Sequence, residues 1–156
     1  MSNRSRQRKP SQQGMTLVEL VVTIAILGIL ASVALPIARF QVKREKERML
    51  LYDLEQMRAA IDSYKDGTNR GAFTAKLDTL GYPPDLKTLV EGVVVQGKKV
   101  KFLRKIPIDP MTGKAEWGLR AVQDDAESDS WGGQNVYDVY SKSPDTGLNG
   151  KKYAEW

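Results

Sequence analysis

The stretch Gly14-Met15-Thr16-Leu17-Val18-Glu19, together with the apolar run from Leu20 to Ala38, decides the fold of this chain. None of the 19 residues from Leu20 to Ala38 is charged. A helix rises 1.5 Å per residue, so a run of this length matches the hydrocarbon core of a bilayer. The sequence therefore predicts a transmembrane helix over residues 15–38, preceded by a leader over residues 1–14.

The leader is strongly basic, and the remainder of the chain is not. Residues 1–14 hold four of the 24 basic residues and no acidic one, so the other basic residues nearly balance the 19 acidic ones. Loss of the leader would leave a chain close to neutral, which argues against a surface for nucleic acid. Positive residues stay on the cytoplasmic side of a membrane, so the leader is predicted to be cytoplasmic and residues after 38 to lie outside.

Glu19 distinguishes this segment from an ordinary membrane anchor. A secretory signal peptide has a similar basic and apolar pattern, but its apolar region is shorter and ends at a small-residue cleavage site, which is missing here. A plain signal anchor stays open. A carboxylate inside an apolar helix costs on the order of 2.5–3.5 kcal/mol, so Glu19 needs a partner unless it reaches up to the lipid headgroups.

The stretch Gly14–Glu19 resembles the processing site of type IV prepilins and type II secretion pseudopilins. The resemblance implies a cut between Gly14 and Met15 by a prepilin peptidase, which also methylates the new amine. It further implies that Glu19, the fifth residue after the cut, acts in filament assembly. Members of this family usually have Phe where this chain has Met15, and Met is likewise apolar and flexible.

Physical reasoning supports an assembly role for Glu19 and for Pro36. Met15 and Glu19 are one helical turn apart, about 6 Å, so a neighbouring copy shifted along the filament can place its α-ammonium against this carboxylate. Such a buried pair would fix the register of the filament more than it would add stability. Pro36 removes a helical hydrogen bond and predicts a broken or bent helix. The family also carries Pro at this place, where the helix loosens on assembly.

The helix is predicted to continue as an amphipathic segment over residues 39–67. Apolar residues at spacings of four, three, four and three form one stripe: Leu50, Leu54, Met57, Ile61 and Tyr64. Gly67 and Asn69 are expected to end the helix in left-handed conformations. The mixed run of charges from Lys43 to Arg48 keeps a small positive excess beside the membrane.

Residues 68–156 are predicted to form a small β-sheet domain outside the membrane. We expect a short helix within residues 82–92, a hairpin with arms 93–95 and 100–103, and two further strands at 115–121 and 136–141. Two prolines exclude residues 106–113 from a central strand and predict a shaped loop. The fold class is therefore α+β, type IV pilin-like, with one long N-terminal helix packed on a small antiparallel sheet.

The loop 106–113, the sequence Trp131-Gly132-Gly133 and the strand 137–141 resemble the globular half of the major, or G-type, pseudopilins of type II secretion. The resemblance implies a homopolymeric filament in the periplasm, anchored in the inner membrane, that drives protein export across the outer membrane. It implies as partners other copies of the chain, the peptidase and methyltransferase, minor pseudopilins, the inner-membrane secretion platform and membrane lipid. The alternative is a type IV pilin or minor pilin for adhesion, motility or DNA uptake. Major adhesive pilins often carry a disulfide loop, so the lack of Cys favours the pseudopilin.

The composition argues against an enzyme. The chain has no His and no Cys, which removes imidazole bases, thiol nucleophiles and His/Cys zinc sites. No carboxylate pair stands in a recognisable catalytic context.

No cofactor is predicted, and the alternative is calcium. Many major pseudopilins bind calcium in an Asp-rich final loop. In this chain residues 144–150 offer one carboxylate, Asp145, whereas calcium takes six to eight oxygens. The acidic stretch Asp124, Asp125, Glu127 and Asp129 does not match an EF-hand loop and is expected to be a solvated loop.

Overall fold

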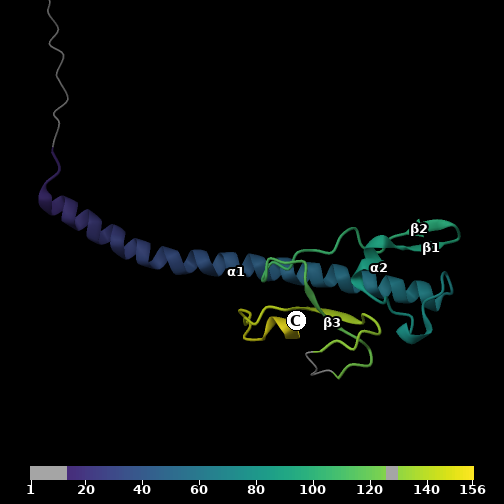
Figure 1. The fold of residues 1–156 in the computed structure, drawn as a ribbon. Coiled ribbons are helices and arrows are strands. Elements are labelled where there is room, and N and C mark those ends of the chain that lie inside the picture. The colour runs from purple at the N-terminus through teal and green to yellow at the C-terminus, as the bar shows by residue number, and fades with distance from the viewer. Residues whose placement is uncertain (1–13, 126–129) are drawn as a thin grey trace, which may run out of the picture. The chain divides into compact units, whose positions relative to one another are not determined.

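The computed structural model describes residues 14–125 and 130–156, without the side chains of residues 33–35. The chain forms two compact units, Met1–Gln41 and Val42–Trp156, each of which is described by itself. Helix α1, Leu17–Asn69, begins in the first unit and ends in the second (Figure 1).

The predicted long helix is confirmed. Of the broken or bent helix predicted at Pro36, the break is wrong and the bend stays a prediction. α1 is one continuous helix that contains Pro36 in its interior. Proline takes away a single N–H donor, so the helix loses one hydrogen bond there while the bonds on either side remain available. The first unit of the structure is therefore a helix without interruption from Leu17 onward.

The end of α1 is formed by a residue that differs from the predicted ones. Gly71 has φ of 69°, while Gly67 and Asn69 lie within the helix. Gly71 N donates to Thr68 O at 2.9 Å and Ala72 N donates to Gly67 O at 3.0 Å. This pair of bonds is a Schellman motif, which places the left-handed residue just past the last helical turn. The helix thus ends a few residues later than predicted.

The predicted apolar stripe of α1 forms the centre of the core in the second unit. All five stripe residues are buried, and Leu50, Leu54, Met57 and Ile61 are completely so. The rest of the chain contributes the facing side chains, chiefly Leu86, Leu89, Trp117, Val136, Val139 and Tyr153. Burial of these side chains supplies the main stabilisation of the unit, at about 25 cal/mol per Å² of apolar surface.

A short helix and a hairpin follow α1, after a single 3₁₀ turn at Leu77–Thr79. Helix α2, Leu86–Glu91, is capped by Asp85, whose Oδ1 accepts from Thr88 N at 2.7 Å. Strands β1, Val93–Val95, and β2, Lys98–Val100, are antiparallel. Gln96 and Gly97 join them with φ of 48° and 79°, which is a two-residue turn with both central residues left-handed. The second arm therefore begins earlier than the predicted residues 100–103.

The second pair of strands is also antiparallel, but it forms a separate sheet. Strand β3, Trp117–Arg120, pairs with β4, Asp138–Ser141, so the described residues of the domain form two two-stranded sheets where one was predicted. After β2, the N–H groups of Phe102 and Leu103 both donate to Leu89 O at the end of α2. These donors are no longer available to a sheet, so the ladder ends at Val100. The described chain closes with a 3₁₀ turn at Tyr153–Glu155.

Candidate functional site

The start of α1 carries the predicted processing and assembly residues. Gly14, Met15 and Thr16 precede the helix. Glu19 N donates to Thr16 Oγ1 at 3.2 Å, so Thr16 is the N-cap and Glu19 lies at the third helical position. This local hydrogen bond follows directly from the T-x-x-E sequence. Met15 and Glu19 are both exposed, and among the described residues none pairs with the Glu19 carboxylate.

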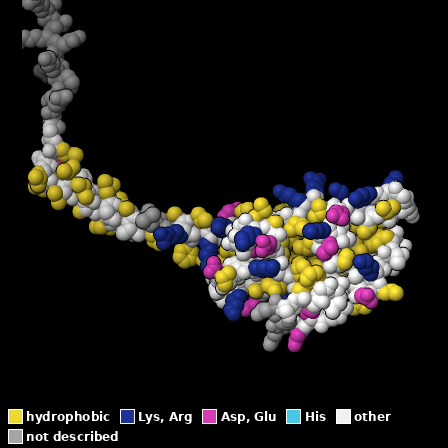
Figure 2. Space-filling model, viewed as in Figure 1, with side chains coloured by type: hydrophobic (Ala, Val, Ile, Leu, Met, Phe, Trp, Pro, Cys, Tyr) yellow, Lys and Arg dark blue, Asp and Glu magenta, His cyan; other side chains and the backbone are white. Residues whose placement is uncertain are grey.

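The first half of α1 presents an apolar surface on every side. Its large apolar side chains are exposed, from Leu17 at 78% to Leu20 at 46%. Figure 2 shows them as a run of hydrophobic side chains along the helix. Two polar side chains form hydrogen bonds to the preceding turn of the helix: Thr23 Oγ1 donates to Leu20 O, and Ser32 Oγ donates to Ile29 O. A helix of this length and composition can cross a membrane, and such a surface otherwise needs a protein partner.

Pro36 is exposed and lies within this apolar half of α1. Its part in filament assembly stays a prediction. Gly14, the other residue of the predicted cut, has no atom within 4 Å of the position that a Cβ would take. Gly14 and Met15 are both exposed, and the cut between them stays a prediction.

Glu47 is a buried, hydrogen-bonded residue of the second unit that the sequence interpretation missed. Its side chain is buried, and Oε1 accepts from Leu148 N at 2.8 Å and from Tyr153 OH at 2.9 Å. The sequence interpretation counted Glu47 only as one charge in the mixed run from Lys43 to Arg48. The signal was present in the spacing: Glu47 stands three residues before Leu50 and so continues the buried stripe.

Lys43 lies one helical turn before Glu47 and contacts the same C-terminal segment. Its Nζ donates to Thr146 O at 2.6 Å and lies 6.0 Å from the centre of the Tyr153 ring. Burial, together with the hydrogen bond and charge of Glu47, holds the pKa of Tyr153 well above its usual range. The phenol is therefore a neutral donor to Glu47 at physiological pH.

The C-terminal loop provides a weak set of ligands for calcium. Asp145 is exposed, and its main-chain oxygen already accepts from Tyr153 N. Within the described residues there is no cluster of three or more His, Cys, Asp or Glu side chains. Calcium binding at Asp145 stays a prediction.

The acidic stretch differs in part from the solvated loop that was predicted. Asp124 Oδ2 accepts from Ala121 N at 2.8 Å and Asp124 Oδ1 accepts from Gly132 N at 3.1 Å. This carboxylate closes the base of the loop. Asp125 is exposed, and Glu127 and Asp129 lie outside the described residues.

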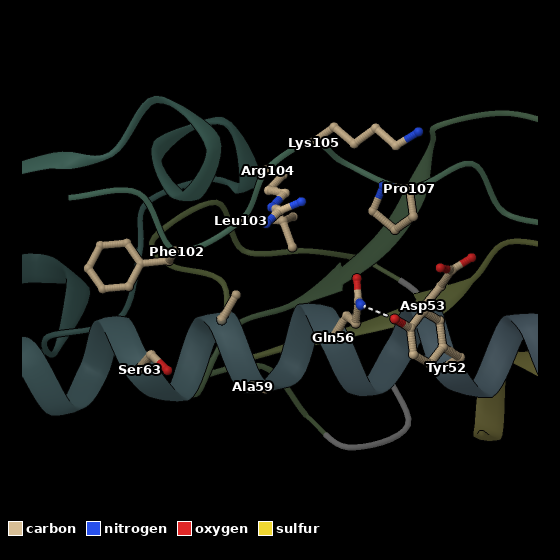
Figure 3. A pocket seen from close by; sticks show the side chains of 11 residues that line it. Tyr52, Asp53, Gln56, Ala59, Ser63, Phe102, Leu103, Arg104, Lys105 and Pro107 are labelled. Carbon is tan, nitrogen blue, oxygen red and sulfur yellow. Dashed lines mark hydrogen bonds between the residues drawn. The ribbon is translucent and has the colours of Figure 1, made fainter. Parts of the chain in front are cut away.

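A pocket of about 560 Å³ lies beside the middle of α1 (Figure 3). It is open to solvent, and α1 lines one side while residues 102–107 line the other. Gln56 Nε2 donates to Tyr52 OH at 2.5 Å along its wall. The pKa of Asp53 is raised, first by burial and second by the charge of Asp109, while Lys105 lowers it. The other lining residues are Ala59, Ala60, Ser63, Phe102, Leu103, Arg104 and Pro107.

Comparisons with known proteins agree with these features. Residues 9–35 match the family model described as the prokaryotic N-terminal methylation motif. The type II secretion system core protein G of Klebsiella michiganensis is 30% identical over 107 residues, which cover 68% of this chain and 72% of that protein. The protein of the same name from Pectobacterium carotovorum is 29% identical over 86% of this chain and 77% of its own length.

A fimbrial protein is also similar, over a shorter stretch. The type IV major fimbrial protein FimA of Dichelobacter nodosus is 38% identical over 64 residues, which cover 40% of this chain and 41% of that protein. No solved structure matches the chain. The matches that extend over most of the chain, with the methylation motif at its start and the long apolar helix, show that this protein belongs to the family of the type II secretion system core protein G, within the type IV pilin-like proteins.

Proposed function

We propose that this protein is the major pseudopilin of a type II secretion system. In this function the chain is a structural subunit and not an enzyme. It is anchored in the inner membrane by the apolar half of α1, with the leader in the cytoplasm and residues 42–156 in the periplasm. It polymerises with copies of itself into a periplasmic filament that drives protein export across the outer membrane.

The exposed apolar surface of α1 is the observation that carries this proposal. Side chains that stay exposed on all sides of a helix have to be covered by lipid before assembly and by other subunits after it. Glu19 has no partner among the described residues, so the filament has to supply one. The α-ammonium of Met15 from a neighbouring copy is one turn away along the axis and carries the opposite charge.

The other partners in this proposal come from the family resemblance. A prepilin peptidase would cut between Gly14 and Met15 and methylate the Met15 amine, which keeps that amine positively charged. Minor pseudopilins and the inner-membrane platform would contact the filament at its ends. These contacts are proposed from the family, and no nucleic acid is among them.

The proposal is tested by processing and by assembly. Mass spectrometry of chain produced with its peptidase should show a protein that begins at methylated Met15, and an intact leader would contradict the processing step. Glu19→Ala should leave membrane insertion unchanged and remove filaments from sheared cell fractions. Glu45→Ala is the matched control, because Glu45 is an exposed carboxylate on α1 whose one ion pair, among described residues, is with Arg48 at 3.5 Å.

A type IV pilin is the second candidate, supported by the 38% identity to the fimbrial protein. Deletion of the gene in its host separates the two functions. Loss of proteins from the culture medium, with surface pili and motility intact, supports the pseudopilin. Loss of pili or DNA uptake with normal secretion supports the pilin and would overturn the proposal.

A further inference from the structure

The C-terminal loop, residues 144–152, forms hydrogen bonds between its own backbone groups. Gly147 N donates to Lys151 O at 2.8 Å and Gly150 N donates to Gly147 O at 3.0 Å. Thr146 and Lys152 form an isolated antiparallel bridge, and Asn149 Oδ1 accepts from Lys151 N. The carbonyl oxygens of Gly147 and Lys151 are therefore engaged in hydrogen bonds within the loop.

Glu47 joins this loop to α1. Its Oε1 accepts from the backbone of Leu148 in the loop and from the phenol of Tyr153 just after it. Glu47 and Tyr153 are both buried, so the loss of the bond between them leaves the buried Tyr153 hydroxyl without a partner. One carboxylate of the helix therefore holds the loop at its tip and at its base.

Lys43 supplies a positive charge to the same loop. The 2.6 Å bond from its Nζ to Thr146 O is a charge-assisted bond from an ammonium to a carbonyl oxygen. A calcium ion that used this carbonyl would compete with the ammonium and be repelled by it. Asp145, the one carboxylate of residues 144–150, is exposed and gives a cation little support.

We propose that Lys43 and Glu47 of α1 form a side-chain clamp that takes the place of a metal ion in fixing the C-terminal loop. The ammonium binds a loop carbonyl, as a cation would, and the carboxylate binds the donors that face α1. The loop is therefore fixed in the same step as the core, because Lys43, Glu47 and the buried stripe lie on one helix. The clamp is a property of the folded second unit and does not depend on filament assembly.

The test uses the processed full-length chain in detergent micelles and follows thermal unfolding by tryptophan fluorescence. All three tryptophans lie after residue 116, so the signal reports the second unit and not the membrane helix. For the wild-type chain, chelator and millimolar calcium should each change Tm by about 1 °C or less, because a ligand that does not bind the native state does not stabilise it. A rise of roughly 5 °C or more with calcium would overturn the proposal.

Two variants test the clamp directly. Glu47→Ala should lower Tm by roughly 5–10 °C and Lys43→Met by a smaller amount, while Glu45→Ala and Lys46→Met, which change exposed residues of the same helix, should not. Trypsin should cut after Lys151 and Lys152 at least several-fold faster in both clamp variants. If Glu47→Ala does not fold, Tyr153→Phe takes its place, because it keeps the ring and removes the bond to Glu47. Wild-type Tm and trypsin resistance in the clamp variants would show that the loop is held by other contacts.

Discussion

The Ser141 hydroxyl donates a hydrogen bond of 2.7 Å to Asp109 Oδ2, and both side chains are completely buried. Ser141 ends β4, whereas Asp109 lies in the proline-containing loop 106–113. The other carboxylate oxygen of Asp109 accepts from Met111 N at 2.8 Å. Asp109 therefore shapes its own loop and ties that loop to the second sheet.

Replacement of Ser141 by Ala should lower the free energy of unfolding by about 1–3 kcal/mol, because it leaves one buried oxygen of Asp109 without its donor. Urea denaturation followed by tryptophan fluorescence measures the change. Ser63→Ala, at an exposed position of α1, is the matched control. Equal midpoints for Ser141→Ala and the wild type would show that the hydrogen bond contributes nothing to stability.

We predict that replacement of Arg58 by Lys lowers the stability of the folded protein. Its Nε donates to Asp138 Oδ1 at 2.7 Å, and its Nη2 donates to the main-chain oxygens of Val139 and Trp156 at 3.2 and 2.7 Å. A lysine ammonium cannot span these three acceptors, so Arg58→Lys should cost about 1–2 kcal/mol. The same urea titration tests this, with the exposed Arg48→Lys as control. If Arg58→Lys lowers the free energy of unfolding by no more than Arg48→Lys does, the bridging role of Arg58 is contradicted.

Asp53 should destabilise the native state at neutral pH. Its pKa is raised in the folded chain, mainly by burial and then by Asp109. Such a carboxyl stabilises the native state when it is protonated. This contribution is complete at pH values below the unfolded pKa, about 3.9, and is lost as the pH rises through the folded pKa.

Asp53→Asn mimics the protonated carboxyl and should therefore raise Tm near pH 7, with a gain that shrinks as the pH falls toward about 4. Tryptophan fluorescence melts at several pH values measure this dependence. Asp66→Asn is the control, because Asp66 is an exposed carboxylate on the same helix. An unchanged or lower Tm for Asp53→Asn at neutral pH would contradict the prediction that the Asp53 carboxylate destabilises the native state.

We predict that the folded protein loses stability in alkaline solution because of Tyr153. Its pKa is raised by burial, by the hydrogen bond to Glu47 and by nearby carboxylates. The stability that this phenol contributes is fully present below its unfolded pKa of about 10 and is lost as the pH rises beyond that value.

The urea midpoint should therefore fall above about pH 10, and Tyr153→Phe should show a flatter decline. Some decline remains in the variant, because burial also raises the pKa of Tyr64 and Tyr82. Parallel pH profiles for the wild type and Tyr153→Phe would exclude Tyr153 as the main alkaline group.

The sequence by itself determined the features that depend on neighbouring residues. An uncharged run long enough to span a bilayer and the apolar stripe from Leu50 to Tyr64 are both local patterns, and the structure confirms each as part of α1. The family resemblance also rested on contiguous motifs. Local sequence was sufficient because a helix forms its hydrogen bonds within itself.

Only the tertiary structure decided how distant segments meet. Glu47 reads as one charge in a charged run, yet it is buried against Leu148 and Tyr153, about a hundred positions away. The division into two sheets has the same origin, because Phe102 and Leu103 give their N–H groups to α2 instead of to a strand. A buried polar group is stable only when a partner satisfies it, and the identity of a partner so far along the chain is set by packing rather than by local sequence.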